Sequence, residues 1–178
     1  MPAPSADVFD RLRSLAAIDD PDARPTRTVE EIFTGKPLAT IPVGTAVDVE
    51  AAVAKARVAQ IAWAKRPVAD RLKIVERYRD LVIKNSDFLM DLLQAEAGKA
   101  RWAAQEELID LMANANYYAR VSADLLKPHQ VQALLPGIGK TTVCYQPKGV
   151  VGVISPWNYP MTLTASDSVP ALIAGNAV

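Results

Sequence analysis

The sequence contains one cysteine and one histidine in 178 residues, and it carries no excess charge of either sign. A single cysteine cannot form an internal disulfide, so we expect a reducing compartment, by default the cytoplasm. Twenty basic residues balance twenty acidic ones, which gives no sign of a nucleic-acid surface or a polybasic membrane patch. His129 follows Lys127 and Pro128 in an expected loop, so neither a metal site nor a Ser–His–Asp relay is supported.

Long apolar runs and a secretory leader are also missing. No run approaches the ~20 residues that a membrane span needs. The start, Met1 to Asp7, has neither a basic nor a hydrophobic region, so it does not resemble a signal peptide. Half of the residues are apolar and 22% are charged, an ordinary globular composition, and the length suffices for one domain with a core. We therefore expect neither a membrane nor a nucleic acid as partner.

Helical periodicity dominates the first 126 residues, interrupted by one short hairpin. The expected elements are a helix at 8–17, strands at 26–32 and 38–43, and helices at 45–65, from 67, from 86 to Gly98, and around 108–119. The apolar residues expected on buried faces are Val49, Val53, Val58, Ile61 and Ala62 in the first long helix, Leu72, Val75, Tyr78, Leu81 and Val82 in the second, and Leu108, Leu111, Met112, Ala115, Tyr118 and Ala119 in the fourth.

Two β segments are expected at 131–135 and 141–145, separated by a Pro- and Gly-rich turn. Gly139-Lys140-Thr141-Thr142 looks like the end of a P-loop. That motif needs a glycine at position 134, where this chain has Leu134, and it needs a helix directly afterwards. A nucleotide triphosphatase is thus disfavoured. Cys144 lies in the second segment with no basic neighbour that would favour a thiolate, so we interpret it as a structural thiol.

The most informative segment is Gly149-Val150-Val151-Gly152-Val153-Ile154-Ser155-Pro156-Trp157-Asn158-Tyr159-Pro160. Its uncharged apolar part, 150–154, predicts a strand buried on both faces of a parallel sheet. A helix is expected from about 161 to 174, ended by Gly175. Asn158 would then lie in a strand-to-helix loop at the carboxyl end of a strand, where open α/β sheets bind ligands. We expect its carboxamide to face a cleft, and exposure to bulk solvent would count against this interpretation.

This segment, together with Lys148 before it and Gly175-Asn176-Ala177-Val178 after it, closely resembles the aldehyde dehydrogenase superfamily. Members carry a proline-tryptophan-asparagine-aromatic-proline motif after such a strand, and a glycine-asparagine pair about one helix later. The resemblance implies an α/β fold, the amino-terminal part of a cofactor-binding domain with helices on a mainly parallel open sheet. Residues 1–126 would begin that domain, a protruding β arm at 127–148 would join subunits into a homo-oligomer, and 149–178 would resume the domain.

The same resemblance implies a chemistry. A thiolate adds to an aldehyde, and the Asn158 amide stabilises the oxyanion that forms, since its dipole is oriented before the charge develops. Ile154, Ser155, Pro156, Trp157 and Asn158 would line the path of the cofactor, NADP or NAD, with NADP favoured. Trp157 would also pack between strand and helix, and Tyr159 would flank the aldehyde channel. In the family the thiol and the water-activating glutamate lie downstream of the position of Val178, so we expect residues 1–178 alone to be inactive.

Residues 26–178 look closest to bacterial succinate-semialdehyde dehydrogenases, which usually favour NADP. Better-known members of that branch place an arginine for the substrate carboxylate in the helix after the motif. Here 161–178 contain no Lys or Arg, and Ser166 stands at about that position, so another aldehyde stays open. The parallel partner of the strand at 150 is mostly missing, which suggests a chain cut inside its fold. The alternatives are a naturally short, non-catalytic module that binds or pairs through the arm and, third, the P-loop protein.

Overall fold

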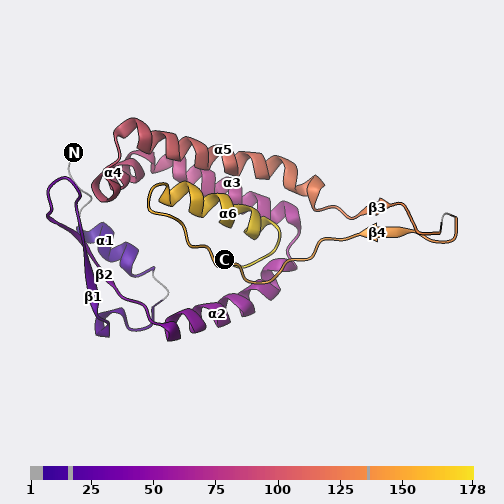
Figure 1. The fold of residues 1–178 in the computed structure, drawn as a ribbon, viewed down its shortest axis with the longest axis horizontal. Coiled ribbons are helices and arrows are strands. Elements are labelled where there is room, and N and C mark those ends of the chain that lie inside the picture. Colours follow the sequence, from indigo (N-terminus) through magenta and orange to yellow (C-terminus); the bar gives the residue numbers. More distant parts are fainter. Residues whose placement is uncertain (1–5, 16–17, 136) are drawn as a thin grey trace.

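The computed structural model describes residues 6–15, 18–135 and 137–178, and Figure 1 shows a helical body from which one hairpin projects. The elements in chain order are α1 (Ala6–Arg13), η1 (Pro21–Ala23), β1 (Thr26–Glu30), β2 (Pro37–Pro42), α2 (Ala46–Ala64), α3 (Val68–Lys84), α4 (Ser86–Ala97), α5 (Arg101–Leu125), β3 (His129–Val131), β4 (Thr141–Val143) and α6 (Pro160–Ile173). Within the described ranges, no helix combines the length and the apolar character needed to cross a membrane.

The core forms where α5 packs against α3 and α6. Its fully buried side chains include Leu108, Leu111 and Ile173, and the side chains of Val75 and Val82 are almost as enclosed. The sequence periodicity therefore identified the buried faces of α3 and α5 in the main. Tyr78 and Leu81 in α3 were also expected inside, but they are 37% and 48% exposed.

Local signals located the helix ends well. Thr45 and Asp48 form a capping box at the start of α2, in which the Asp48 carboxylate accepts hydrogen bonds from the Thr45 backbone N–H and hydroxyl, each at 2.7 Å. These bonds, aided by the nearby Arg24 guanidinium, hold the pKa of Asp48 below its usual range. Gly98 ends α4 with φ 67°, a left-handed conformation that glycine adopts without strain.

The face of α2 that was expected to be buried is exposed instead. Val49, Val53, Val58 and Ile61 are 44–73% exposed. In Figure 1, α2 lies apart from α3, α5 and α6 and approaches them at its C-terminal end. An apolar stripe is buried only if another element covers it, and in the described part of the chain none covers this one.

Both hairpins form as antiparallel pairs. β1 pairs with β2 and forms the predicted hairpin, in a register that places Thr26 opposite Pro42. β3 and β4 form the projecting hairpin, but β3 begins at His129, earlier than the predicted segment, and Cys144 lies just beyond β4 with an exposed thiol. Pro136, in the expected turn, is outside the described residues. Because Thr141 begins a strand and not a helix, the P-loop alternative is excluded.

The predicted mainly parallel open sheet does not form among the described residues. Among the described residues, parallel pairing is limited to one bridge between Val150 and Ala177. In it, Val151 N–H donates to the Ala177 carbonyl and Ala177 N–H donates to the Gly149 carbonyl, each at 2.9 Å. Among the described residues, none pairs with the following part of the expected strand. Ile154 is accordingly fully exposed and not buried.

Candidate functional site

The segment that joins the parallel bridge to α6 carries the residues that the sequence singled out. Trp157 and Asn158 form a turn directly before α6, and Pro160 occupies its first turn, where a missing N–H costs nothing. The turn before the helix was therefore placed correctly, but the strand expected at 150–154 is reduced to the single bridge at Val150. The surroundings of the turn were not as expected: Asn158 is exposed and Trp157 is 84% exposed, so within this chain neither side chain faces an enclosed cleft. This exposure counts against the expected cleft-facing carboxamide.

A buried carboxylate from α5 holds the N-terminus of α6. Glu107 is completely buried, and its Oε1 accepts hydrogen bonds from the backbone N–H groups of Met161, at 2.6 Å, and Thr162, at 3.1 Å. The Thr162 hydroxyl donates to the Glu107 carbonyl at 2.6 Å. The residue that precedes α6, Tyr159, provides no side-chain cap of its own. Glu107 thus satisfies first-turn amides and places a negative charge at the positive end of the helix dipole.

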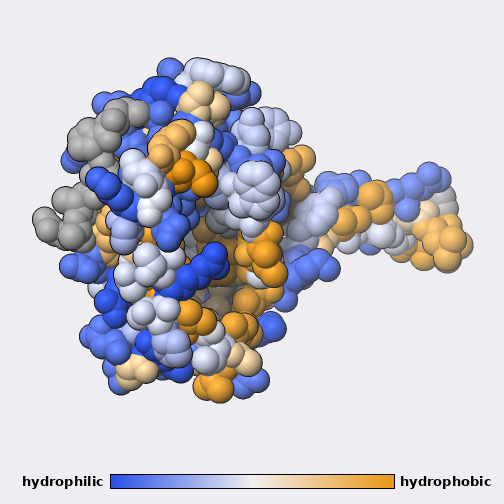
Figure 2. Space-filling view, turned by 60° about the vertical axis from the view of Figure 1, so that its left-hand side comes forward, coloured by the Kyte–Doolittle hydropathy of each residue, from blue (hydrophilic) through white to orange (hydrophobic). Residues whose placement is uncertain are grey.

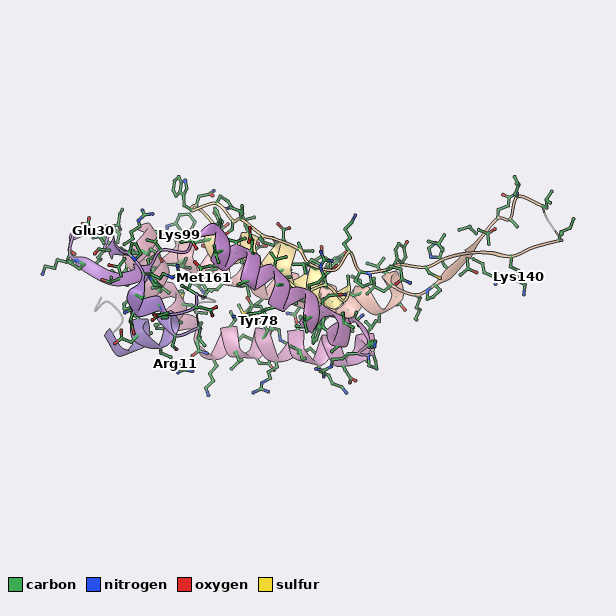
Figure 3. All side chains as sticks on the ribbon, turned by 90° about the horizontal axis from the view of Figure 1, so that it is seen from below. Arg11, Glu30, Tyr78, Lys99, Lys140 and Met161 are labelled. Atoms are coloured by element: carbon green, nitrogen blue, oxygen red, sulfur yellow. The ribbon has the colours of Figure 1, made fainter. Side chains whose placement is uncertain are left out.

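Lys99 completes this arrangement. Its ammonium donates to Glu107 Oε2 at 2.6 Å and lies 3.8 Å from the centre of the Tyr159 ring. Only 10% of the Lys99 side chain is exposed. In Figure 3, Lys99 lies close to Met161, the helix residue whose amide Glu107 binds. One ion pair therefore connects α5, the start of α6 and the aromatic residue next to Asn158.

Sequence reasoning missed Glu107 and Lys99, although one signal was available. Ala104, Glu107, Leu108 and Leu111 follow the spacing of a buried helix face, and all four are buried. A carboxylate within such a face needs a partner, because burying an unpaired charge is costly.

The C-terminal end of α6 is held by side chains from α2 and α3. The Leu172 carbonyl accepts from Trp63 Nε1 at 2.8 Å, the Ile173 carbonyl accepts from Arg71 Nε at 2.8 Å, and Gln60 donates to the Gly175 carbonyl at 2.9 Å. Burial lowers the pKa of the Arg71 guanidinium from its usual value. These donors bind carbonyls at the end of the helix and just beyond it, where helix carbonyls lack their usual partners; the Leu172 carbonyl also accepts from the Gly175 N–H at 3.0 Å. Helix α6 is consequently fixed at both ends by other elements.

Asn176, of the Gly175-Asn176 pair, has a structural role. Asn176 is buried; its amide donates to the Ala171 carbonyl and its Oδ1 accepts from the backbone N–H of Gly149, each at 2.9 Å. Asn176 thereby connects the end of α6 to the start of the 149–160 segment. On the other side of that segment, the Thr164 hydroxyl lies 2.7 Å from the Ser155 hydroxyl and 2.5 Å from the Pro160 carbonyl oxygen.

Two apolar hollows adjoin the start of α6. One, of about 420 Å³, is lined by Ile32, Leu92, Trp157 and Met161 among others. The other, of about 590 Å³, runs along α6 towards α3 and includes Tyr78, and burial raises the pKa of its phenol. Figure 2 shows apolar surface gathered in a hollow of the body and again at the tip of the projecting hairpin.

The predicted cofactor residues lie on consecutive positions of one exposed strip. Ile154, Pro156, Trp157 and Asn158 are exposed, and Ser155 is half-buried. Tyr159, the predicted channel residue, is half-buried under Lys99. Within the described ranges, His, Cys, Asp and Glu side chains form no group of three that could hold a metal ion. The catalytic, cofactor and channel roles stay predictions.

Comparisons with known proteins give consistent matches. A sequence profile described as the Aldehyde dehydrogenase family matches residues 19–178. A protein of Mycobacterium tuberculosis (strain ATCC 25618 / H37Rv), provisionally named succinate-semialdehyde dehydrogenase (NADP+) 2, is 80% identical over 178 residues, which are 100% of this chain and 34% of that protein. A protein of Mycolicibacterium smegmatis (strain ATCC 700084 / mc(2)155), provisionally named succinate-semialdehyde dehydrogenase (NADP+), is 68% identical over the same length and share.

Among solved structures, an aldehyde dehydrogenase from Brucella melitensis biovar abortus 2308 superposes with a TM-score of 0.82 at 27% identity. The match covers 89% of this chain and 32% of that one. The chain thus spans about a third of the length of these relatives.

Proposed function

Because the chain belongs to the aldehyde dehydrogenase family, we propose that the protein carrying it oxidises an aldehyde to a carboxylate and passes a hydride to NADP or NAD. The observation that carries this proposal is the family match over 19–178, which includes the whole segment around Asn158. The relatives named for succinate semialdehyde and NADP+ favour that aldehyde and that cofactor. The absence of Lys and Arg from 161–178 means that the substrate carboxylate would be bound by residues elsewhere.

The exposed strip fits a nicotinamide cofactor. Ile154 and Trp157 present apolar side chains to solvent, and beyond the single bridge at Val150 this segment takes part in no strand pairing among the described residues. Ile154, Ser155, Pro156, Trp157 and Asn158 would hold the cofactor, which supplies the acceptor for the hydride. An apolar strip with few polar groups is the usual lining of such sites.

Asn158 would act on the oxygen of the reacting aldehyde. Once a thiolate adds to the carbonyl carbon, that oxygen becomes negative, and the Asn158 NH2 would donate a hydrogen bond to it. Cys144 is a poor source of the thiolate because it lies just beyond β4, whereas Asn158 lies just before α6. In Figure 1, β4 belongs to the projecting hairpin and α6 to the body. We infer that the nucleophile comes from residues outside these 178, and that other chain segments cover Asn158 when the site is assembled.

The projecting hairpin would join subunits. Leu134 and Ile138 near its tip are 95% and 82% exposed, and a second subunit would bury them. The predicted division into 1–126, 127–148 and 149–178 agrees with this use of the arm. In the assembled protein, the segment at 150–154 would find further partners and become part of the parallel sheet. A cytoplasmic location rests on the single cysteine and stays a prediction.

A kinetic experiment tests the function. The protein extended to the length of its relatives should reduce NADP with succinate semialdehyde faster than with an uncharged aldehyde of equal length. Asn158→Ala should lower kcat by about 10²–10³-fold, an effect much larger than any change in cofactor affinity, whereas the exposed amide variant Gln105→Ala should leave kcat unchanged. An unchanged kcat removes Asn158 from the oxyanion role.

The isolated chain provides a second test. Residues 1–178 alone should oxidise no aldehyde with either cofactor. Turnover that persists in a Cys144→Ser variant would contradict a mechanism in which the thiolate comes from outside these 178 residues. An inactive chain that pairs through its arm, encoded by a gene that stops after Val178, would instead favour the short binding module.

A further inference from the structure

The Lys99–Glu107 pair lies next to the proposed oxyanion donor but contacts neither substrate nor cofactor in the proposed scheme. Glu107 binds the first-turn amides of α6 and is fully buried. Lys99 binds Glu107 and covers the ring of Tyr159. Tyr159 directly follows Asn158, so this pair fixes the position immediately beside the exposed carboxamide.

We propose that Lys99 and Glu107 are positioning residues that aim the Asn158 carboxamide. This inference rests on the proposed oxyanion role of Asn158. Asn158 belongs to an exposed turn, so its own surroundings in this chain do not determine where its amide points. The orientation is set from its flanks: by Lys99 through the Tyr159 ring, and by Glu107 through the start of α6.

The physical basis is that a hydrogen-bond donor helps catalysis only if it is already aimed where charge develops. A cation over an aromatic ring restrains the ring, and the restraint is stronger when the cation is shielded from water, as the mostly buried Lys99 is. The Glu107 carboxylate neutralises that cation and simultaneously anchors two consecutive amides of α6. Loss of either charge frees the turn without removing any group that would touch the substrate.

Steady-state kinetics on the extended, active protein test the proposal. Lys99→Met keeps the length and apolar stem of the side chain but removes its charge, and it should lower kcat by about 10- to 100-fold with a much smaller change in KM. Lys99→Arg should recover most of that loss because it restores the cation. Lys73→Met is the matched control, since Lys73 forms an exposed ion pair with Asp70 on the surface of α3 and should leave kcat unchanged.

A double-mutant cycle separates positioning from a general structural role. If Lys99 acts through Asn158, Lys99→Met should have little further effect on kcat in an Asn158→Ala background. Multiplicative losses in the double variant would overturn the positioning role while leaving the proposed function intact. If Asn158→Ala alone leaves kcat unchanged, the oxyanion role fails, and the positioning role fails with it.

Hydrogen–deuterium exchange tests whether Lys99 and Glu107 restrain the start of α6, and it needs no measurement of enzyme activity. The amides of Met161 and Thr162 are bound by Glu107, whereas first-turn amides of a helix ordinarily lack partners. Peptides covering 157–163 should exchange faster in Glu107→Ala and in Lys99→Met than in the wild-type protein, with Lys73→Met unchanged. Equal exchange in all four proteins would show that the pair does not restrain this segment and would overturn the proposal.

Discussion

Truncating Glu107 should be among the most destabilising single changes in this chain. The side chain is fully buried, two helix amides and one ammonium depend on its carboxylate, and Lys99 is itself largely shielded from solvent. Glu107→Ala leaves all three donors without their acceptor. The neighbouring Glu106 is exposed on the same helix, so Glu106→Ala is a control with the same change in composition and charge.

The magnitude follows from the geometry. Breaking a buried ion pair by removing one partner costs about 3–5 kcal/mol, because the other charge stays buried without compensation. The two amide bonds to a charged acceptor are part of the same loss and are not added to it. We therefore expect Glu107→Ala to lower the free energy of unfolding by about 4 kcal/mol. This is a large fraction of the roughly 5–15 kcal/mol that keeps a typical domain folded.

Urea unfolding followed by far-UV circular dichroism measures the effect, provided that the m-value stays constant. Glu107→Gln should lie between the wild type and Glu107→Ala, since a glutamine oxygen still accepts from the helix amides while the ion pair is lost. Adding Lys99→Met to Glu107→Gln should recover part of the loss, because no buried charge is then unpaired. The reasoning is refuted if Glu107→Ala and Glu106→Ala differ by less than about 0.5 kcal/mol, the scatter of ordinary surface changes.

Three further outcomes follow from individual contacts. The pKa of Asp48 is lowered, so its stabilising effect exists above the ordinary pKa and is lost as pH falls through the folded value; urea midpoints of the wild type and Asp48→Asn should converge in acid. The pKa of Tyr78 is raised, so the wild type should lose stability above about pH 10 as the unfolded state ionises, and Tyr78→Phe should lose less, as alkaline urea titrations would show. Gly98→Ala forces a left-handed residue with a methyl 3.0 Å from Ile32 and should cost about 1–2 kcal/mol in the same urea assay, while Gly139→Ala, with open space around it, should cost much less.

The parts of the fold that could be predicted are those decided by a few adjacent residues. Gly98 and Gly175 end helices because each adopts a backbone conformation that other residues avoid, and the sequence alone identifies such positions. The Thr45–Asp48 capping box is equally local. The position of the loop around Asn158 followed from Pro160 and from the change in hydrophobic pattern before it.

The parts that failed depend on what lies beside an element. The apolar stripe of α2 and the run 150–154 have the periodicity of buried segments, yet Val58 and Ile154 are largely or fully exposed. Periodicity states which face is suited to burial but not whether a neighbour is present to cover it. The partners of Glu107 were missed for a different reason. The spacing of its helix face indicates that Glu107 is buried, but no local pattern shows that it binds the amide of Met161, 54 residues away.

The exposure of Asn158 bears on how the site would work. A carboxamide open to water spends its hydrogen bonds on water, and it gains its full effect on a developing negative charge only when water is excluded. This chain provides a helix held at both ends, a restrained aromatic residue beside the carboxamide, and uncovered apolar surface around Ile154 and Trp157. The contacts that restrain the turn are thus made within this chain and need no further segment. Under the proposed function, the segments that cover Asn158 would only need to exclude water and provide a nucleophile. An inactive isolated chain and a restrained Asn158 turn are therefore expected together.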